Sequence, residues 1–210
     1  MSLMRLTSGA WKARLHGHNG QTEAGMVTAV MTAGRRFLRR IIGATALDVS
    51  TYEEVETDRG ATAQAVAVVV LSSLAAGLGA RGFGGGDAAG IAFFGAVALV
   101  AWTAWALLTY EIGVRILPQP QTRADVGELL RTTGFATAPG LLRVFGLLPG
   151  ATVPVFVVTA VWMLAAMIVG VRQALDYTTT RRAIAVCGLG WVLAIVFAGV
   201  LGFFFGPRVS

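Results

Sequence analysis

The sequence predicts an all-α fold, a polytopic bundle of transmembrane helices. Three observations predict it. Hydrophobic residues make up 55% of the 210-residue chain. Charged residues make up only 13%, against about a quarter in soluble domains. The apolar residues are concentrated in five stretches, and about 20 such residues are enough for an α-helix to cross a hydrocarbon core of about 30 Å. Most of the chain, residues 61–206, is therefore predicted to be a single membrane domain.

Four of the stretches have the length of a span, namely residues 61–80, 88–110, 153–171 and 184–205. The remaining one, residues 134–148, is third in chain order and has only 15 residues. It contains Pro139 and Arg143, so it suits an interfacial or re-entrant piece as well as a crossing.

The distribution of basic residues favours a crossing. With five spans, 14 of the 17 Lys and Arg residues lie on one side, in the N-terminal region and in the loops around 111–131 and 172–182. Basic loops are typically cytoplasmic. We therefore predict five spans with a short third one, in the cell membrane, with the N-terminus cytoplasmic and the C-terminus outside.

The region before the first span is expected to have two parts. Residues 1–25 show no apolar period, so we expect them to be poorly ordered. Residues 26–60 are expected to form an amphipathic helix and a short capped helix. On the first of these, the apolar residues cluster on one face, and the basic residues lie opposite or beside it: Arg35, Arg36, Arg39 and Arg40. This pattern predicts binding to an anionic inner leaflet, although a solvated charge run or packing against the bundle would give the same pattern.

Two capping patterns predict helix starts outside the spans. Ser50 with Glu53, or Thr51 with Glu54, would open the short helix before the first span. Asp125 with Glu128 would open a helix just ahead of the third span.

Small residues recur every four positions in the last span, at Gly190, Ala194, Ala198, Gly202 and Gly206. The fourth span has a similar series, at Ala166, Gly170 and Ala174. Such spacing lets helix backbones approach closely in a membrane. These seams contact either sister spans or a partner protein, and the internal contact is favoured.

Residues that carry catalysis are nearly absent. The only histidines, His16 and His18, lie in the poorly ordered start, and no predicted span contains a carboxylate pair. We therefore predict no catalytic residue, no metal and no cofactor. Arg143 is the one charge well inside an apolar stretch; it is a candidate contact for a lipid headgroup or another anion, or it snorkels to an interface. The net charge of +6 could suit nucleic acid, but the position of the arginines favours the membrane.

Several short motifs resemble the Yip family of five-span membrane proteins in its bacterial form. They are Thr51-Tyr52-Glu53-Glu54 before the first span, Gly134-Phe135-Ala136-Thr137-Ala138-Pro139 entering the third, and Leu147-Leu148-Pro149-Gly150 leaving it. The likeness covers residues 48–205. It implies five spans and a cytoplasmic N-terminus.

These observations lead to a non-enzymatic membrane scaffold or accessory subunit that binds lipids, other membrane proteins or a second copy of itself. The alternative is a small transporter or channel, for which Arg143, Gln64 and Thr103 are the candidate pathway groups.

Overall fold

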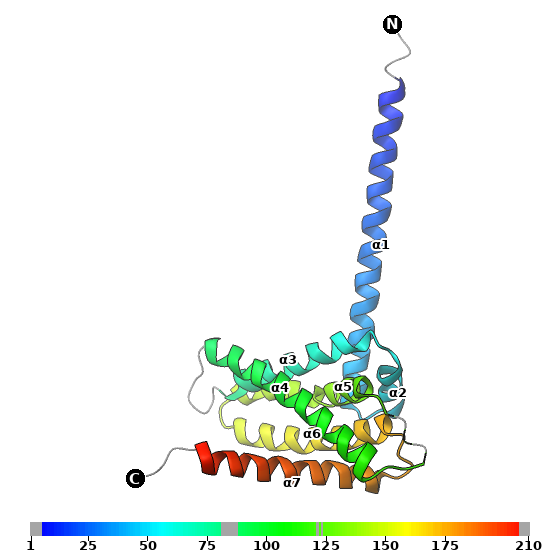
Figure 1. The fold of residues 1–210 in the computed structure, drawn as a ribbon. Helices are drawn as coiled ribbons and strands as arrows, with labels where there is room; N and C mark the ends of the chain where they lie inside the picture. The colour runs from blue at the N-terminus through cyan, green and yellow to red at the C-terminus, as the bar shows by residue number, and fades with distance from the viewer. Residues whose placement is uncertain (1–5, 81–87, 121, 123, 206–210) are drawn as a thin grey trace. The chain divides into compact units, whose positions relative to one another are not determined.

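The computed structural model describes residues 6–80, 88–120, 122 and 124–205, except the side chains of residues 6–24, 88–89, 91–95, 194–195 and 197–205. The chain divides into two compact units, Met1–Arg39 and Arg40–Ser210, each of which is described by itself. The described residues form helices and no strands (Figure 1), which confirms the all-α class. The α-helices are α1 (Leu6–Thr45), α2 (Val49–Thr57), α3 (Ala61–Gly79), α4 (Ala88–Glu111), α5 (Val126–Phe135), α6 (Thr152–Ala174) and α7 (Thr180–Phe205). A π-helical turn, η2 (Ile112–Ile116), extends α4, and a 3-10 helix, η3 (Ala138–Leu147), follows α5.

The prediction of five spanning helices is corrected by the structure. Within the described residues, three helices are long and apolar enough to cross a membrane: Ala61–Gly79, Ala96–Ile116 and Thr152–Ala174. The fifth predicted stretch does form one helix, α7, of 26 residues, but much of its C-terminal half lies outside the described side chains.

The third predicted stretch is not a spanning α-helix. Helix α5 ends at Phe135 and the chain continues as the 10-residue 3-10 helix η3. Pro139 explains the break, because a proline ring inside an α-helix clashes with the carbonyl four residues earlier, here that of Phe135. At about 2.0 Å per residue, η3 is about 20 Å long, shorter than the hydrocarbon core of about 30 Å.

A glycine seam packs the segment from α5 to η3 along α3. The segment contributes one glycine every six residues, at Gly134, Gly140 and Gly146, and α3 contributes a small residue every seven, at Ala65, Ser72 and Gly79. Six residues are two turns of a 3-10 helix, and seven are about two turns of an α-helix, so each series lies on one face. A Cβ added at Gly79 would lie 1.9 Å from the carbonyl oxygen of Arg143. The backbones therefore touch, and both elements run in the same direction.

The buried core of the second unit lies where α4, α5, α6 and α7 meet, around Leu129, Val171, Leu175 and Val186. The hydroxyl of Tyr177 donates a hydrogen bond to the carbonyl oxygen of Leu117 at 2.9 Å, which ties the loop after α6 to the chain after η2. On α6 the small residues Ala166, Gly170 and Ala174 are all buried. Gly170 packs against the backbone of Thr132, so this seam is an internal one.

Helix starts partly follow the predictions. The capping box of Asp125 and Glu128 is confirmed at α5. The short helix α2 is capped instead by Asp48, whose carboxylate accepts from the backbone N–H of Ser50. Helix α1 begins at Leu6, so helical backbone runs through most of residues 1–25, where little order was expected.

Candidate functional site

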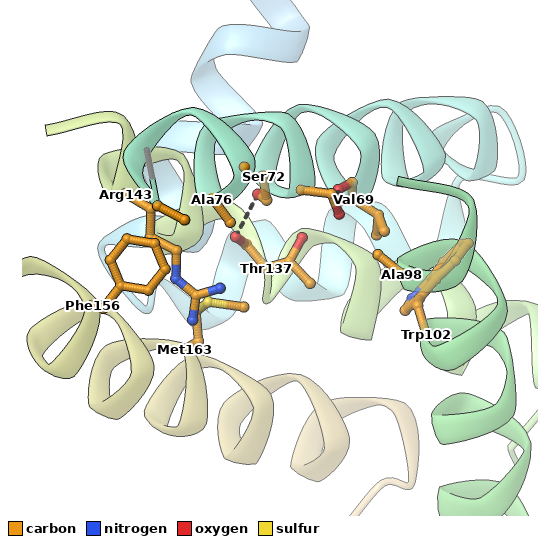
Figure 2. A pocket seen from close by; sticks show the side chains of 12 residues that line it. Val69, Ser72, Ala76, Ala98, Trp102, Thr137, Arg143, Phe156 and Met163 are labelled. Atoms are coloured by element: carbon orange, nitrogen blue, oxygen red, sulfur yellow. Dashed lines mark hydrogen bonds between the residues drawn. The ribbon is translucent and has the colours of Figure 1, made fainter. Parts of the chain in front are cut away.

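Arg143 lies on η3 and turns its side chain into the bundle (Figure 2). Its Nε donates to the hydroxyl oxygen of Thr159 on α6 at 3.2 Å. Its guanidinium carbon lies 5.3 Å from the centre of the Phe156 ring, within the range of a cation–π contact. No residue of the described part accepts a hydrogen bond from its two Nη atoms. This half-buried cation therefore keeps unused donors inside the membrane domain.

A cavity of about 430 Å³ lies beside Arg143, between α3, α4, η3 and α6. Most of its wall is apolar, and its polar neighbours already bond to one another. Ser72 donates to the carbonyl oxygen of Thr137 at 2.8 Å (Figure 2), and Trp102 Nε1 donates to the Thr133 hydroxyl at 3.1 Å. Arg143 is the only charged residue in the lining of this cavity.

A second cavity of about 290 Å³ also has Arg143 in its wall, together with residues of α4, α6 and α7. Trp105 and Trp191 line it and meet edge to face, with ring centres 6.0 Å apart. The indole N–H of Trp105 is buried, and no residue of the described part accepts its hydrogen bond. Buried polar groups are rarely left in this state, so a second donor near Arg143 also lacks an acceptor.

Arg40 was predicted to contact the membrane surface, and the structure contradicts that assignment. Its side chain is only 2% exposed. Nη2 lies 2.9 Å from Glu54 Oε1 and 2.7 Å from Asp58 Oδ2, and Nη1 donates to Gln64 Oε1 at 2.8 Å. Arg40 projects from the side of α1 opposite to its apolar face, and this side packs against the bundle through Gly43 and Thr51. The helical period located this face correctly but did not show that it is buried.

Two of the three groups named for a transport path do not line either cavity. Gln64 belongs to the network around Arg40. Thr103 is exposed on α4, and its hydroxyl donates to the carbonyl oxygen of Leu99 at 2.9 Å. Arg143 is the one of the three that lines a cavity.

The other three arginines of the N-terminal segment, Arg35, Arg36 and Arg39, are exposed. The apolar residues of the same segment are exposed too, with exposed fractions between 53% and 67%: Met26, Val27, Val30, Met31, Leu38 and Ile42. The segment 26–42 thus presents an apolar face and basic side chains at the same time. We call this the amphipathic face of α1.

A buried arginine that the sequence did not single out, Arg131, caps the C-terminus of α2. Its Nε donates to the carbonyl oxygens of Val55 at 3.0 Å and of Glu56 at 2.9 Å. Cationic side chains commonly bond the last carbonyls of a helix. No period or motif marks this role, because donor and acceptors are about 75 residues apart in sequence.

The carboxyl group of Glu56 lies next to this cap. Partial burial, followed by the negative charges of Glu128 and Asp176, raises the pKa of Glu56 to about 7. Within the described residues, no group of three or more His, Cys, Asp or Glu side chains is placed to hold a metal ion.

The predicted seam on α7 is described at one position. Gly190 is buried, and a Cβ added there would lie 3.0 Å from the Trp105 ring of α4. The side chains of Ala194, Ala198 and Gly202, and all of Gly206, lie outside the described residues. A partner for that part of the seam stays a prediction.

Comparison with known protein families decides the relationship. Residues 48–201, most of the chain, match the Yip1 domain. The chain belongs to the Yip1 domain family. No curated protein and no solved structure matches it. The Yip1 domain contains Arg143 and both cavities, whereas the amphipathic face of α1 precedes it. Together with the three long apolar helices, membership supports a membrane location for this Yip1 protein.

Proposed function

We propose that this Yip1 protein is a non-enzymatic scaffold or accessory subunit of a bacterial cytoplasmic membrane, which binds anionic lipids and other membrane proteins. The observation that carries the proposal is the amphipathic face of α1, where exposed apolar side chains stand beside Arg35, Arg36 and Arg39. Such a helix lies in the plane of the interface with its apolar face among the acyl chains.

The energetics favour an anionic surface. Full burial of one Val, Leu, Ile or Met side chain contributes about 1.5–3 kcal/mol. Because the six apolar side chains are a little more than half exposed, partial burial of each contributes about 1 kcal/mol on that scale. Each arginine near an anionic surface adds about 1 kcal/mol. The total is well above thermal energy, and about a third of it depends on lipid charge.

Spin labels in full-length protein test this attachment. In a Cys187→Ala background, single labels replace Val30 and Leu38 on the apolar side and Thr32 on the polar side. In anionic vesicles, oxygen should reach the first two labels and a water-soluble relaxation agent should reach the third. Replacing Arg35, Arg36 and Arg39 by Gln should move the apolar labels into water, and replacing them by Lys should not. Labels that stay in water in wild-type protein would refute the attachment.

The proposal also places the N-terminus in the cytoplasm and the C-terminus outside. Eight of the 17 basic residues precede α3, and basic flanks are favoured on the cytoplasmic side. Tags at both ends, probed from each side of sealed vesicles, test this orientation. Detection of both tags on the same side would contradict it.

A scaffold and a transporter differ in what accompanies the protein. Purification in mild detergent, followed by mass spectrometry, should recover stoichiometric membrane-protein partners or bound lipid. A protein that purifies alone and moves solute across liposomes would instead be a transporter.

A further inference from the structure

The interior of the bundle has more hydrogen-bond donors than acceptors around Arg143. The Nη atoms of Arg143 and the indole N–H of Trp105 have no acceptor among the described residues. Both residues line the smaller cavity, and Arg143 lines the larger one as well. A charged side chain within a membrane costs about 2.5–3.5 kcal/mol or more. A bound anion would offset this cost and accept the free hydrogen bonds.

The direction of the side chain argues against snorkelling. The carbonyl oxygen of Arg143 lies against Gly79, the last residue of α3. The guanidinium, however, bonds Thr159, seven residues after the start of α6, or about 10 Å along that helix. Met163, one turn further, lines both cavities. The charge therefore points toward the middle of the bundle and away from the end of α3.

The size and lining of the larger cavity indicate the kind of occupant. One turn of an α-helix, about 10 Å wide and 5.4 Å high, takes up about 420 Å³, so a cavity of about 430 Å³ has no room for a helix of another protein. It does fall within the range of about 300–1,000 Å³ that is common for small-molecule sites. Its walls are apolar residues such as Val69, Ala76 and Met163, which suit a hydrocarbon chain.

We propose that Arg143 binds the anionic headgroup of a membrane lipid, with one acyl chain of that lipid in the larger cavity. The guanidinium can donate two parallel hydrogen bonds to a phosphate or carboxylate, and the indole N–H of Trp105 is placed to supply a third donor. This inference rests on the proposed role in lipid binding and names one lipid site. That site is separate from the amphipathic face of α1.

Lipid retention by the full-length protein tests the site. The protein is reconstituted with phosphatidylglycerol and phosphatidylcholine of identical chains, extracted in mild detergent and analysed by native mass spectrometry. Wild-type protein should retain one phosphatidylglycerol. Arg143→Gln should lower that retention at least tenfold, Arg143→Lys should lower it less, and Trp105→Phe should lower it severalfold. Arg115→Gln is the matched control, because Arg115 is 73% exposed and paired with Glu111, and it should retain lipid like the wild type.

Several results would overturn the site. Equal retention of both lipids by the wild type, or full retention of phosphatidylglycerol by Arg143→Gln, would remove it. Displacement of the lipid by inorganic phosphate would assign Arg143 to a free anion, and a protein that co-purifies in its place would assign it to an acidic partner. Monodisperse elution and unchanged circular dichroism establish that each variant is folded. If Arg143→Gln does not fold, the Lys variant and the lipid preference of the wild type still decide.

Failure of this site can be distinguished from failure of the proposed function. Replacing Arg35, Arg36 and Arg39 by Gln should leave the retained lipid in place. If these replacements remove the lipid and Arg143→Gln does not, the lipid binds on α1, and only the inner site is refuted. If the wild type retains no lipid and the α1 labels stay in water, the proposed lipid-binding function fails as well.

Discussion

Replacing Arg40 separates a structural arginine from the surface arginines beside it in sequence. Arg40→Ala removes a guanidinium that is 2% exposed and bonded to Glu54, Asp58 and Gln64. Removing one partner of a buried ion pair costs about 3–5 kcal/mol. Because the side chains of Glu54 and Asp58 keep exposed fractions of 34% and 37%, water can solvate them after the change. We therefore expect a loss near the lower end, about 3 kcal/mol.

The measurement is reversible unfolding in mixed micelles, followed by circular dichroism as the denaturing detergent increases. Arg36→Ala is the control, because Arg36 is exposed on the same helix, and exposed substitutions usually change the free energy of unfolding by less than about 0.5 kcal/mol. Arg40→Lys should fall between them, since an ammonium group lacks the planar fork of a guanidinium.

The opposite ranking is expected for lipid binding. Arg36→Gln should weaken the contact of α1 with anionic vesicles, and Arg40→Gln should leave it unchanged. If Arg40→Ala unfolds within about 0.5 kcal/mol of Arg36→Ala, the network around Arg40 is not what stabilises this end of the bundle, and the reasoning is refuted.

Three further substitutions test other contacts in the same unfolding assay. Gly79→Ala should destabilise by about 1–3 kcal/mol, because its Cβ would lie 1.9 Å from a backbone carbonyl oxygen of η3, whereas Gly34→Ala, with nothing within 4 Å, should not destabilise; equal effects would contradict the seam. Tyr177→Phe should cost about 1–2 kcal/mol, because the carbonyl oxygen of Leu117 loses its donor; no change would mean that water replaces the hydroxyl. The pKa of Glu56 is raised from 4.5 to about 7 in the folded state, so the folded state binds the extra proton between these values and stability falls as pH rises through them. Glu56→Gln should abolish this dependence and stabilise the protein above pH 7 relative to the wild type; an unchanged pH profile would contradict the assignment.

The sequence was sufficient for the parts of this fold that depend on local pattern. Residues 61–80 and 153–171 were predicted as spans, and α3 and α6 occupy Ala61–Gly79 and Thr152–Ala174. An apolar run of this length contains its own signal, since the helix satisfies all its backbone groups within the segment. The capping box at Asp125 is equally local.

The parts that failed depend on contacts between distant segments. Arg36 and Arg40 belong to the same basic run, yet one is exposed and the other is buried by residues 14 to 24 positions later. A helical period shows that two side chains lie on different sides of α1, but it does not show which side another helix covers. For the same reason, neither the cap formed by Arg131 nor the cavities beside Arg143 could be predicted.

The third element shows why a segment too short to be an ordinary span still runs along most of α3. From Ala65 to Gly79 the seam on α3 covers 14 residues, or about 21 Å. The matching stretch from Gly134 to Gly146 has only 12 residues, which would cover about 18 Å as an α-helix and about 24 Å as a 3-10 helix. A chain that changes from α5 to η3 midway has the intermediate length that the match requires. Pro139 forces that change, and the glycines allow the backbone contact that stabilises it. Because the match runs to the end of α3, it also fixes Arg143 against Gly79, from where its side chain reaches the interior of the bundle.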